Sequence, residues 1–302
     1  MPVGAHRFAA SSQACITPGT MSNDISAPDT LVQLRAELDA LDNEMHALLM
    51  RRAGIIERVA RDGGKHGTKI RPGREASMVR RLLAQHRGTL PPQSILRIWR
   101  EIFAAALIIE GGQTVAVCAP DESCDIPALA REHFGPLTPM RRHRNPLQTL
   151  SDIESGAAQV AVVPPPSDEP DGAWWTALMG RGNTQLSIIA KLPFWTQRAE
   201  GTPLGDAYVV AAIRPDPSGH DRGLLALEVN ADTSRARLTS IVNAAGFNAT
   251  NIWLKRRGDF ARALVEVEGL VDDNDARLLK IHGLDAPAIT IGGFAVPLDG
   301  TP

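Results

Sequence analysis

The first long pattern in the chain is a stripe of apolar residues that begins after Thr30 and recurs at alternating steps of three and four residues. It consists of Leu31, Leu34, Leu38, Leu41, Met45, Leu48, Ile55 and Val59. This spacing is typical of one face of a helix that packs along its whole length against another helix. Thr30 and Gln33 form a candidate capping box at its start, and Gly63-Gly64 ends the pattern.

A helix of ~33 residues spans ~50 Å, and two short neighbouring helices cannot cover so long an apolar stripe. We therefore expect the long helix to pair with the same helix of a second copy, which makes the protein a homodimer. Residues 1–27 are rich in small and polar residues without periodicity. We expect a disordered tail there, with Met21 as a second candidate start of the protein.

Two shorter helices are predicted after the long one. The second starts after Arg71-Pro72-Gly73 and reaches about His86, and the third runs from Pro91-Pro92 to just before Gly111-Gly112. Their apolar residues recur at helical spacing: Met78, Val79, Leu82 and Leu83 in the second, then Ile95, Ile98, Trp99, Ile102, Phe103, Ala106 and Leu107 in the third. Residues 28–112 are thus predicted to form an all-α domain of three helices.

From Gln113 onward the chain changes to short β-branched runs that alternate with helical patterns. The expected order is βαβαβ, with strands at Thr114–Cys118, Met140–His143 and Gln159–Pro164 and helices at Ile126–Phe134 and Leu147–Gly156. One more strand is predicted at Gln185–Ala190. This pattern predicts an α/β half-domain over residues 113–204.

The last part of the chain, residues 205–302, is predicted to be a separate α+β domain. Its strands are expected at Leu224–Val229, Ala249–Lys255, Ala263–Glu268 and Ala288–Val296, and its helices at Ser234–Gly246 and Asp272–His282. The order βαββαβ is that of the ferredoxin-like fold. The sequence as a whole therefore predicts a multidomain protein.

The charge balance limits the kinds of partner that the protein attracts. The 302 residues include 32 Lys and Arg against 34 Asp and Glu, so no overall basic field attracts nucleic acid or an anionic membrane, and any anion site must be local. The three cysteines have neither metal-ligand spacing nor the pattern of a disulfide framework, which favours a reducing compartment, the cytoplasm.

Arg52 stands where the stripe of the first helix requires an apolar residue, one step after Leu48. Its guanidinium keeps its proton, and burial without an anionic partner is costly. Three interpretations stay open: Arg52 binds an anionic ligand, reaches solvent at the edge of the stripe, or pairs with Glu44 or Glu57.

Three further polar residues fall on or beside apolar faces. Arg74 and Glu75 lie in the first turn of the second helix, and Glu110 continues the line of Trp99 and Phe103 on the third. A solvated pair at a helix start is the alternative for the first two, and exposure next to a glycine is the alternative for Glu110. Together with Arg52, these residues point inward from three helices, as in a ligand pocket inside a bundle, and arginine suits the recognition of carboxylates.

Four segments of the helical region carry a more specific signal. They are Leu34–Asp42, Leu48–Arg52, Arg71–Glu75 and Arg97–Ile102. In this order they resemble the all-helical, type II chorismate mutase family, whose reaction converts chorismate to prephenate.

This resemblance implies an intertwined homodimer with two sites. It assigns Arg52 and Arg74 of one subunit, with Arg35 of the partner subunit, to the substrate carboxylates, and Glu75 to the substrate hydroxyl. Helix geometry agrees, because Arg35 and Arg52 lie ~25 Å apart along one helix and cannot hold the same small ligand.

The implied reaction is an intramolecular rearrangement that requires no nucleophile, metal or cofactor. The protein must hold the reactive conformer and stabilise charge on the breaking ether oxygen. The family's lysine donor to that oxygen falls on Gly63, with Lys65 and Arg61 two residues to either side, and Lys65 is the candidate replacement. Ala106 stands where the family has a serine that contacts a carboxylate.

Glu110 stands where many family members have a glutamine that also donates to the ether oxygen. A glutamate donates a hydrogen bond only when it is protonated. The sequence therefore predicts a higher activity at mildly acidic pH.

The remaining chain resembles parts of a prephenate dehydratase, through Val115–Val117 and Ile153–Pro164, and its regulatory amino-acid-binding (ACT) domain. After Val163-Pro164 the chain continues Pro165-Pro166-Ser167 instead of the family's acidic or amide residue, and the catalytic threonine-arginine-phenylalanine is replaced by Gly205–Tyr208. The ACT motifs are replaced by Arg235–Leu238 and Leu254–Arg257. We expect no dehydratase activity, and we leave open whether the last domain binds phenylalanine or is only structural.

The sequence therefore predicts a cytoplasmic chorismate mutase of aromatic amino-acid biosynthesis. The alternative is a catalytically silent binding or regulatory protein that dimerises through its helices and senses an aromatic metabolite. Gly63 and Ala106 favour the alternative.

Overall fold

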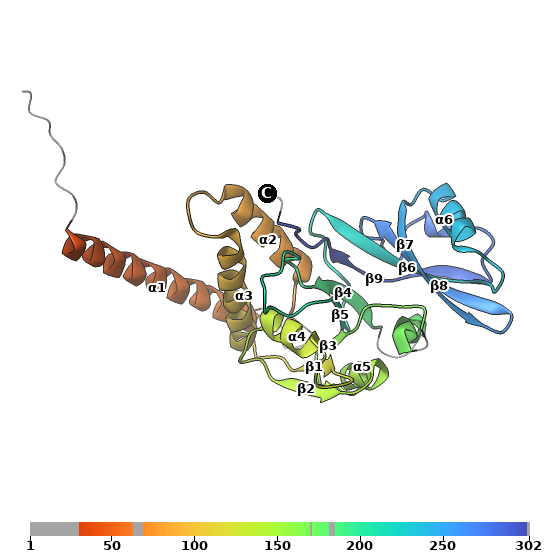
Figure 1. Ribbon diagram of the computed structural model, residues 1–302, viewed down its shortest axis with the longest axis horizontal. Coiled ribbons are helices and arrows are strands. Elements are labelled where there is room, and N and C mark those ends of the chain that lie inside the picture. The colour runs from red at the N-terminus through yellow and green to blue at the C-terminus, as the bar shows by residue number, and fades with distance from the viewer. Residues whose placement is uncertain (1–29, 63–68, 170, 181–184, 301–302) are drawn as a thin grey trace, which may run out of the picture. The chain divides into compact units, whose positions relative to one another are not determined.

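The computed structural model describes residues 30–62, 69–169, 171–180 and 185–300 (Figure 1). The predicted tail, 1–27, lies outside the described residues, as do Gly63 and Lys65. The chain divides into two compact units, residues 1–51 and 52–302, so that the boundary falls within the first helix.

The long helix α1 runs from Leu31 to Asp62, 32 residues. Its predicted capping box is present, because the backbone N–H of Thr30 donates to Oε1 of Gln33 at 2.7 Å and the N–H of Gln33 donates to Oγ1 of Thr30 at 3.3 Å. No residue of α1 is buried. The apolar stripe is exposed in the single chain, with Leu48 at 63%.

Helices α2 (Pro72–Gln85) and α3 (Pro92–Ile109) lie where the apolar periodicity predicts them. Both start with a proline in the first turn, where its missing N–H costs nothing. They share one apolar core with residues from later parts of the chain: Ala76, Val79, Leu96 and Phe103 with Phe194, Trp195 and Ala295. The two helices are therefore packed against the sheet region rather than only against each other.

A sheet of nine strands forms the centre of the second unit, in the order β2-β1-β3-β5-β4-β9-β6-β8-β7. Its first three strands, β1 (Val115–Cys118), β2 (Met140–His143) and β3 (Val160–Val163), are parallel. Helices α4 (Ile126–Phe134) and α5 (Pro146–Glu154) connect them. Alternate residues of β1 point to opposite faces, so α4 packs on Val115 and Val117 and α5 on Ala116 and Cys118.

Two antiparallel strands continue the sheet. These are β4 (Ser187–Leu192) and β5 (Ala207–Ala211), and β5 pairs with both β3 and β4. The sequence interpretation missed β5, although it is a continuous apolar run typical of a fully buried strand. A 3₁₀ segment, η1 (Asp171–Met179), buries Trp174 and Trp175 against the face that α5 covers.

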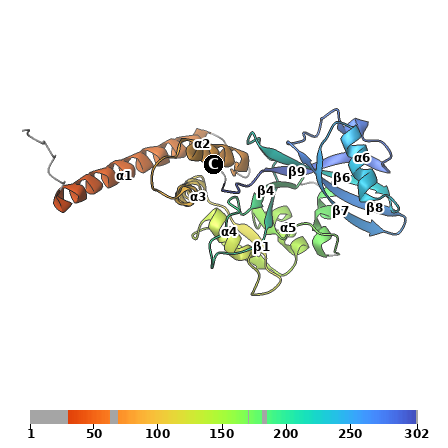
Figure 2. The ribbon, with the colours of Figure 1, turned by 45° about the horizontal axis from the view of Figure 1, so that its top comes forward.

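The C-terminal part of the sheet is antiparallel, in the order β9-β6-β8-β7. Its elements are β6 (Asp221–Asn230), α6 (Arg235–Ala244), β7 (Ala249–Arg257), β8 (Phe260–Glu268), η2 (Leu278–Lys280) and β9 (Ala286–Ala295). Helix α6 covers one face of these strands (Figure 2). The opposite face shares a single core with the α5 side of the sheet.

The predicted helix at Asp272–His282 is wrong, because that segment contains turns and the short 3₁₀ helix η2. The carboxylate of Asp272 accepts from the N–H of Asn274 at 2.9 Å, and that of Asp275 accepts from the N–H of Arg277 at 2.9 Å. Such local side-chain bonds compete with helical hydrogen bonding. The predicted order βαββαβ is therefore βαββ followed by a 3₁₀ turn and a strand.

The coarse prediction, a helical N-terminal region followed by mixed α/β structure, is confirmed, while the boundaries at residues 112 and 204 stay predictions. In the part of the chain that the structure describes, no helix is both long and apolar enough to cross a membrane.

The two halves of the sheet meet where β4 lies beside β9, at the pair Ile188 and Gly292. Gly292 has φ of +129°, a conformation that side chains rarely adopt. A Cβ atom at this position would lie 2.1 Å from the carbonyl oxygen of Ile188. Only glycine allows the two backbones to approach so closely.

We predict that Gly292→Ala destabilises the protein by about 1–3 kcal/mol for the strained backbone and by about 1–3 kcal/mol more for the steric overlap. Gly201→Ala is the matched control, because Gly201 also has a positive φ but has open space around its Cβ position. Urea unfolding followed by tryptophan fluorescence measures both. Equal losses in the two variants would contradict the steric argument.

Candidate active site

The predicted site residues are distributed over three helices. Arg35 lies in the first unit and is exposed. Lys65 lies outside the described residues. The other predicted residues belong to the second unit: Arg52 on α1, Arg74 and Glu75 on α2, and Ala106 and Glu110 at the end of α3.

Arg52 and Arg74 are brought close enough for their charges to interact. Burial lowers the pKa of the Arg52 guanidinium, and the positive charge of Arg74 lowers it further. Arg52 is half-buried and Arg74 is exposed in the single chain. Within the described residues of the second unit, Glu57 included, Arg52 has no ion-pair partner. Two neighbouring guanidinium groups that repel each other are an arrangement that a bound dianion stabilises.

Glu75 forms an ion pair that sequence reasoning missed. Its Oε2 accepts from Nη1 of Arg100 at 2.7 Å, and the two side chains are 13% and 9% exposed. Burial raises the pKa of Glu75 and lowers that of Arg100, while each partner opposes the shift of the other. The pair engages one of the two carboxylate oxygens of Glu75, Oε2.

Arg100 lies on the buried face of α3, between Leu96 and Phe103. Its guanidinium stacks over the rings of Phe103 and Phe194, at 5.8 and 5.6 Å from their centroids. The helical spacing from Leu96 and Phe103 was a sequence signal that could have identified it. Its acidic partner could not be identified in this way, because the pair joins two helices.

Ala106 and Glu110 are one helical turn apart at the C-terminal end of α3. The N–H of Glu110 donates to the carbonyl oxygen of Ala106 at 3.0 Å, and both residues are half-buried. Glu110 is the last residue before two glycines with positive φ, Gly111 and Gly112, which end the helix. Glu110 is therefore the C-cap residue of α3.

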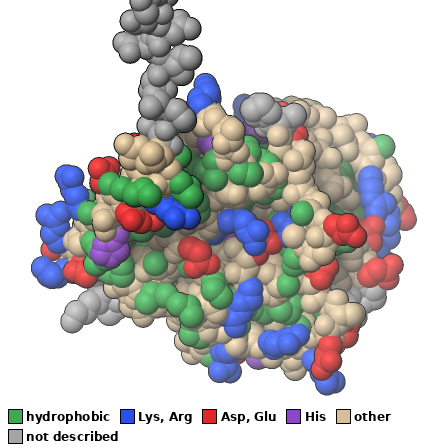
Figure 3. All heavy atoms as spheres, turned by 60° about the vertical axis from the view of Figure 1, so that its left-hand side comes forward, with side chains coloured by type: hydrophobic (Ala, Val, Ile, Leu, Met, Phe, Trp, Pro, Cys, Tyr) green, Lys and Arg blue, Asp and Glu red, His purple; other side chains and the backbone are tan. Residues whose placement is uncertain are grey.

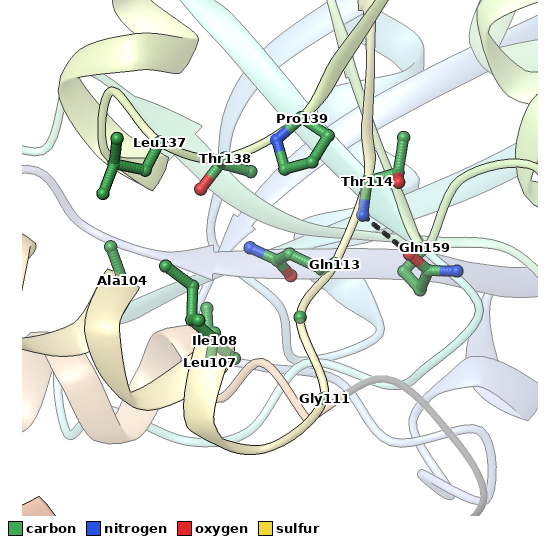
Figure 4. Close-up of a pocket in the computed structure, with 11 residues that line it drawn as sticks. Ala104, Leu107, Ile108, Gly111, Gln113, Thr114, Leu137, Thr138, Pro139 and Gln159 are labelled. Carbon is green, nitrogen blue, oxygen red and sulfur yellow. Dashed lines mark hydrogen bonds between the residues drawn. The ribbon is translucent and has the colours of Figure 1, made fainter.

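A cavity of about 460 Å³ lies on another side of α3 (Figure 4). Leu107 and Ile108 line it from the helix, Thr138 lines it from the opposite wall, and Gln159 accepts a hydrogen bond from the N–H of Thr114 at 2.8 Å. None of the predicted site residues lines it, and its lining has no charged side chain. This cavity therefore does not fit a doubly negative ligand.

The molecular surface has no single extended basic area on the face shown in Figure 3, where basic, acidic and apolar side chains are interspersed. Among the described residues, no group of three or more His, Cys, Asp or Glu side chains has the arrangement of a metal site. The positive charge at Arg52 and Arg74 is thus a local feature of a chain with net charge −2.

Comparisons with known proteins identify relatives of the helical region. Residues 34–111 match the chorismate mutase type II family. Bifunctional chorismate mutase/prephenate dehydratases from Pseudomonas aeruginosa and Aquifex aeolicus are each 30% identical to the chain over 145 residues, which is 45% of this chain and 39% of the relative. The resemblance of the helical region to that family is confirmed.

The chain spans about two fifths of the length of the curated relatives that it matches. A solved prephenate dehydratase from Streptococcus mutans aligns with a TM-score of 0.44 and 13% identity, over 62% of this chain and 99% of that one. A score of this size does not define the fold of the chain.

We predict that Glu75→Ala destabilises the protein by about 3–5 kcal/mol, because it leaves the charge of Arg100 buried without its partner. Replacing Arg100 by Met in the same chain should recover most of this loss. Arg141→Ala is the control: it breaks an ion pair with Asp152 of similar length, 2.8 Å, in which the arginine is 52% exposed, and should cost about 0–1 kcal/mol. Urea unfolding of the four proteins measures the differences. A Glu75→Ala loss no larger than that of Arg141→Ala would contradict the argument.

Proposed function

We propose that this protein is a chorismate mutase that converts chorismate to prephenate in aromatic amino-acid biosynthesis. The observation that carries the proposal is the pair of neighbouring guanidinium groups, Arg52 and Arg74, inside the segment that matches type II chorismate mutases. Chorismate carries two carboxylates, and arginine binds carboxylates with two parallel hydrogen bonds. The half-buried position of Arg52 strengthens such bonds, because water competes less there.

In the proposed site, Arg52 and Arg74 hold the substrate together with Arg35 of the partner subunit. The homodimer that this requires is supported by α1, whose apolar stripe is exposed along the whole helix in the single chain. Burying such a stripe against a second copy removes a large apolar area from water. Glu75 accepts from the substrate hydroxyl through Oε1, and Ala106 contacts the substrate through its methyl group.

The reaction breaks a carbon–oxygen bond and forms a carbon–carbon bond within one molecule. The protein contributes by holding the reactive conformer and by donating hydrogen bonds to the ether oxygen as negative charge develops there. We assign these donations to Glu110 and Lys65, with no metal or cofactor.

We further propose the division of the chain into the helical domain 28–112, a truncated dehydratase-like region 113–204 and an ACT-like domain 205–302. Dehydratase activity is absent in this proposal. The carbonyl oxygen of Pro164, where the dehydratase resemblance ends, accepts from the indole N–H of Trp174 at 3.0 Å, so this loop is bonded to the core. We place the protein in the cytoplasm, without nucleic-acid or membrane partners.

The alternative function is a catalytically silent regulatory protein that dimerises through α1 and senses an aromatic metabolite. The ion pair between Glu75 and Arg100 favours it, because the carboxylate proposed to bind the substrate is already engaged. Loss of the family lysine at Gly63 also favours it.

A direct assay of chorismate disappearance distinguishes the two functions. We expect the full chain to be active and Arg52→Ala to lower kcat/KM by about a hundredfold, the loss of charge-assisted hydrogen bonds to one carboxylate. Arg51→Ala, which removes an exposed neighbouring arginine, should leave kcat/KM within about twofold. A well-folded chain that does not accelerate the reaction would favour the silent protein.

We also expect Glu110→Gln to change the dependence of kcat on pH. A carboxylate cannot donate a hydrogen bond to the ether oxygen, whereas glutamine donates at every pH, so the two proteins should differ in their pH–rate profiles. Glu101→Gln, an exposed position on the same helix, serves as the control. Identical profiles for wild type and Glu110→Gln would count against the assigned donor.

A further inference from the structure

Helix α2 starts with Pro72 and has no capping side chain of its own. The first N–H groups of a helix need acceptors from outside the helix. At α2 the N–H groups of Gly73 and Arg74 donate to Oδ1 and Oδ2 of Asp216, at 2.9 and 3.0 Å. Asp216 lies between β5 and β6, 143 residues after Gly73, so the cap comes from a distant segment of the chain.

The backbone of Asp216 lies close to that of Gly73 at the start of α2. A Cβ atom on Gly73 would lie 1.9 Å from the carbonyl oxygen of Asp216, so only glycine permits this approach. Nε of Arg71 donates to Oδ2 of the same carboxylate at 3.2 Å. The Asp216 side chain is 15% exposed, and its negative charge lies at the positive end of the helix dipole, where it is stabilising.

The segment that carries Asp216 is held to α2 over two further turns. The hydroxyl of Ser77 donates to the carbonyl oxygen of Ser218 at 3.0 Å. The guanidinium of Arg80 donates to Oγ of Ser218 at 2.7 Å and to the carbonyl oxygens of His220 and Val296 at 3.1 and 2.7 Å. These bonds keep α2 and the segment before β6 in one arrangement.

The capped turn carries Arg74 and Glu75, the two residues of α2 in the proposed active site. The N–H of Arg74 is itself one of the two bonded groups. Asp216 also acts on Glu75 through its charge: burial raises the pKa of Glu75, Arg100 opposes that shift, and Asp216 adds to it. The backbone that sets the direction of both side chains is therefore capped by a carboxylate from outside the helical region.

We propose that Asp216 is a positioning residue for the mutase reaction. By capping α2 it directs Arg74 and Glu75 toward the substrate, which makes the region after β5 a working part of the active site. This inference rests on the proposed mutase function.

The test compares the steady-state kinetics of Asp216→Ala with those of the wild-type full chain on chorismate. We expect kcat/KM to fall by about tenfold or more. The rise in KM should account for most of the change, because Arg74 binds the carboxylate in the ground state and in the transition state alike. Asp216→Asn keeps one acceptor oxygen and should give an intermediate value.

Asn145→Ala is the matched control. Asn145 caps α5 by accepting from the N–H of Gln148 at 2.9 Å, so Asn145→Ala also removes an N-cap, but from another helix. Its kcat/KM should stay within about twofold of wild type. Wild-type kinetics in Asp216→Ala, or an equal fall in Asn145→Ala, would overturn the proposal.

Amide hydrogen exchange gives a readout that does not require turnover. The amides of residues 73–77 should exchange faster in Asp216→Ala than in wild type or Asn145→Ala, and unchanged exchange there would refute the cap. If the folded wild type has no mutase activity, the proposed function fails and the positioning role fails with it, whereas exchange still reports on the cap. The two failures are thus distinguishable.

Discussion

The arrangement of the second unit depends on the amide groups at the start of α2, because the helix itself offers them no acceptor. A helix that begins with proline and lacks a capping side chain requires an outside acceptor, and Asp216 supplies it. The acceptor lies on the chain segment that leads into β6, so satisfying the helix joins the helical region to the sheet. The bonds of Arg80 and the apolar core around Phe103 and Phe194 extend the same junction.

Positive charge is concentrated in the helical region, although the chain as a whole is nearly neutral. The chain has a net charge of −2, yet Arg52 and Arg74 are neighbours, and Arg100 is buried one helix away. Arg100 is neutralised by Glu75 within the protein, whereas Arg52 is half-buried beside another cation. The same residue type therefore has two settings here: one arginine is paired inside the fold, and we propose that the other two form a local anion site.

The apolar stripe of α1 is exposed to solvent, whereas the apolar residues of the sheet are buried. The strands of the second unit bury nearly all of their apolar residues, with β5 buried throughout, whereas α1 buries none. An apolar face of this length is costly in water. This contrast is the physical reason for proposing a second copy as the partner of α1, and in that proposal two copies together complete the active site.

The sequence by itself determined the features that depend on local periodicity. These are the three helices, the capping box at Thr30, most strands and the misfit of Arg52 in an apolar stripe, because each is encoded within a few helical turns or one run of β-branched residues. Tertiary structure decided the rest. The partner of Arg100 and the cap from Asp216 depend on contacts between distant segments of the chain. Local patterns contain no information on which distant acceptor a donor meets, and only the folded chain defines that pairing.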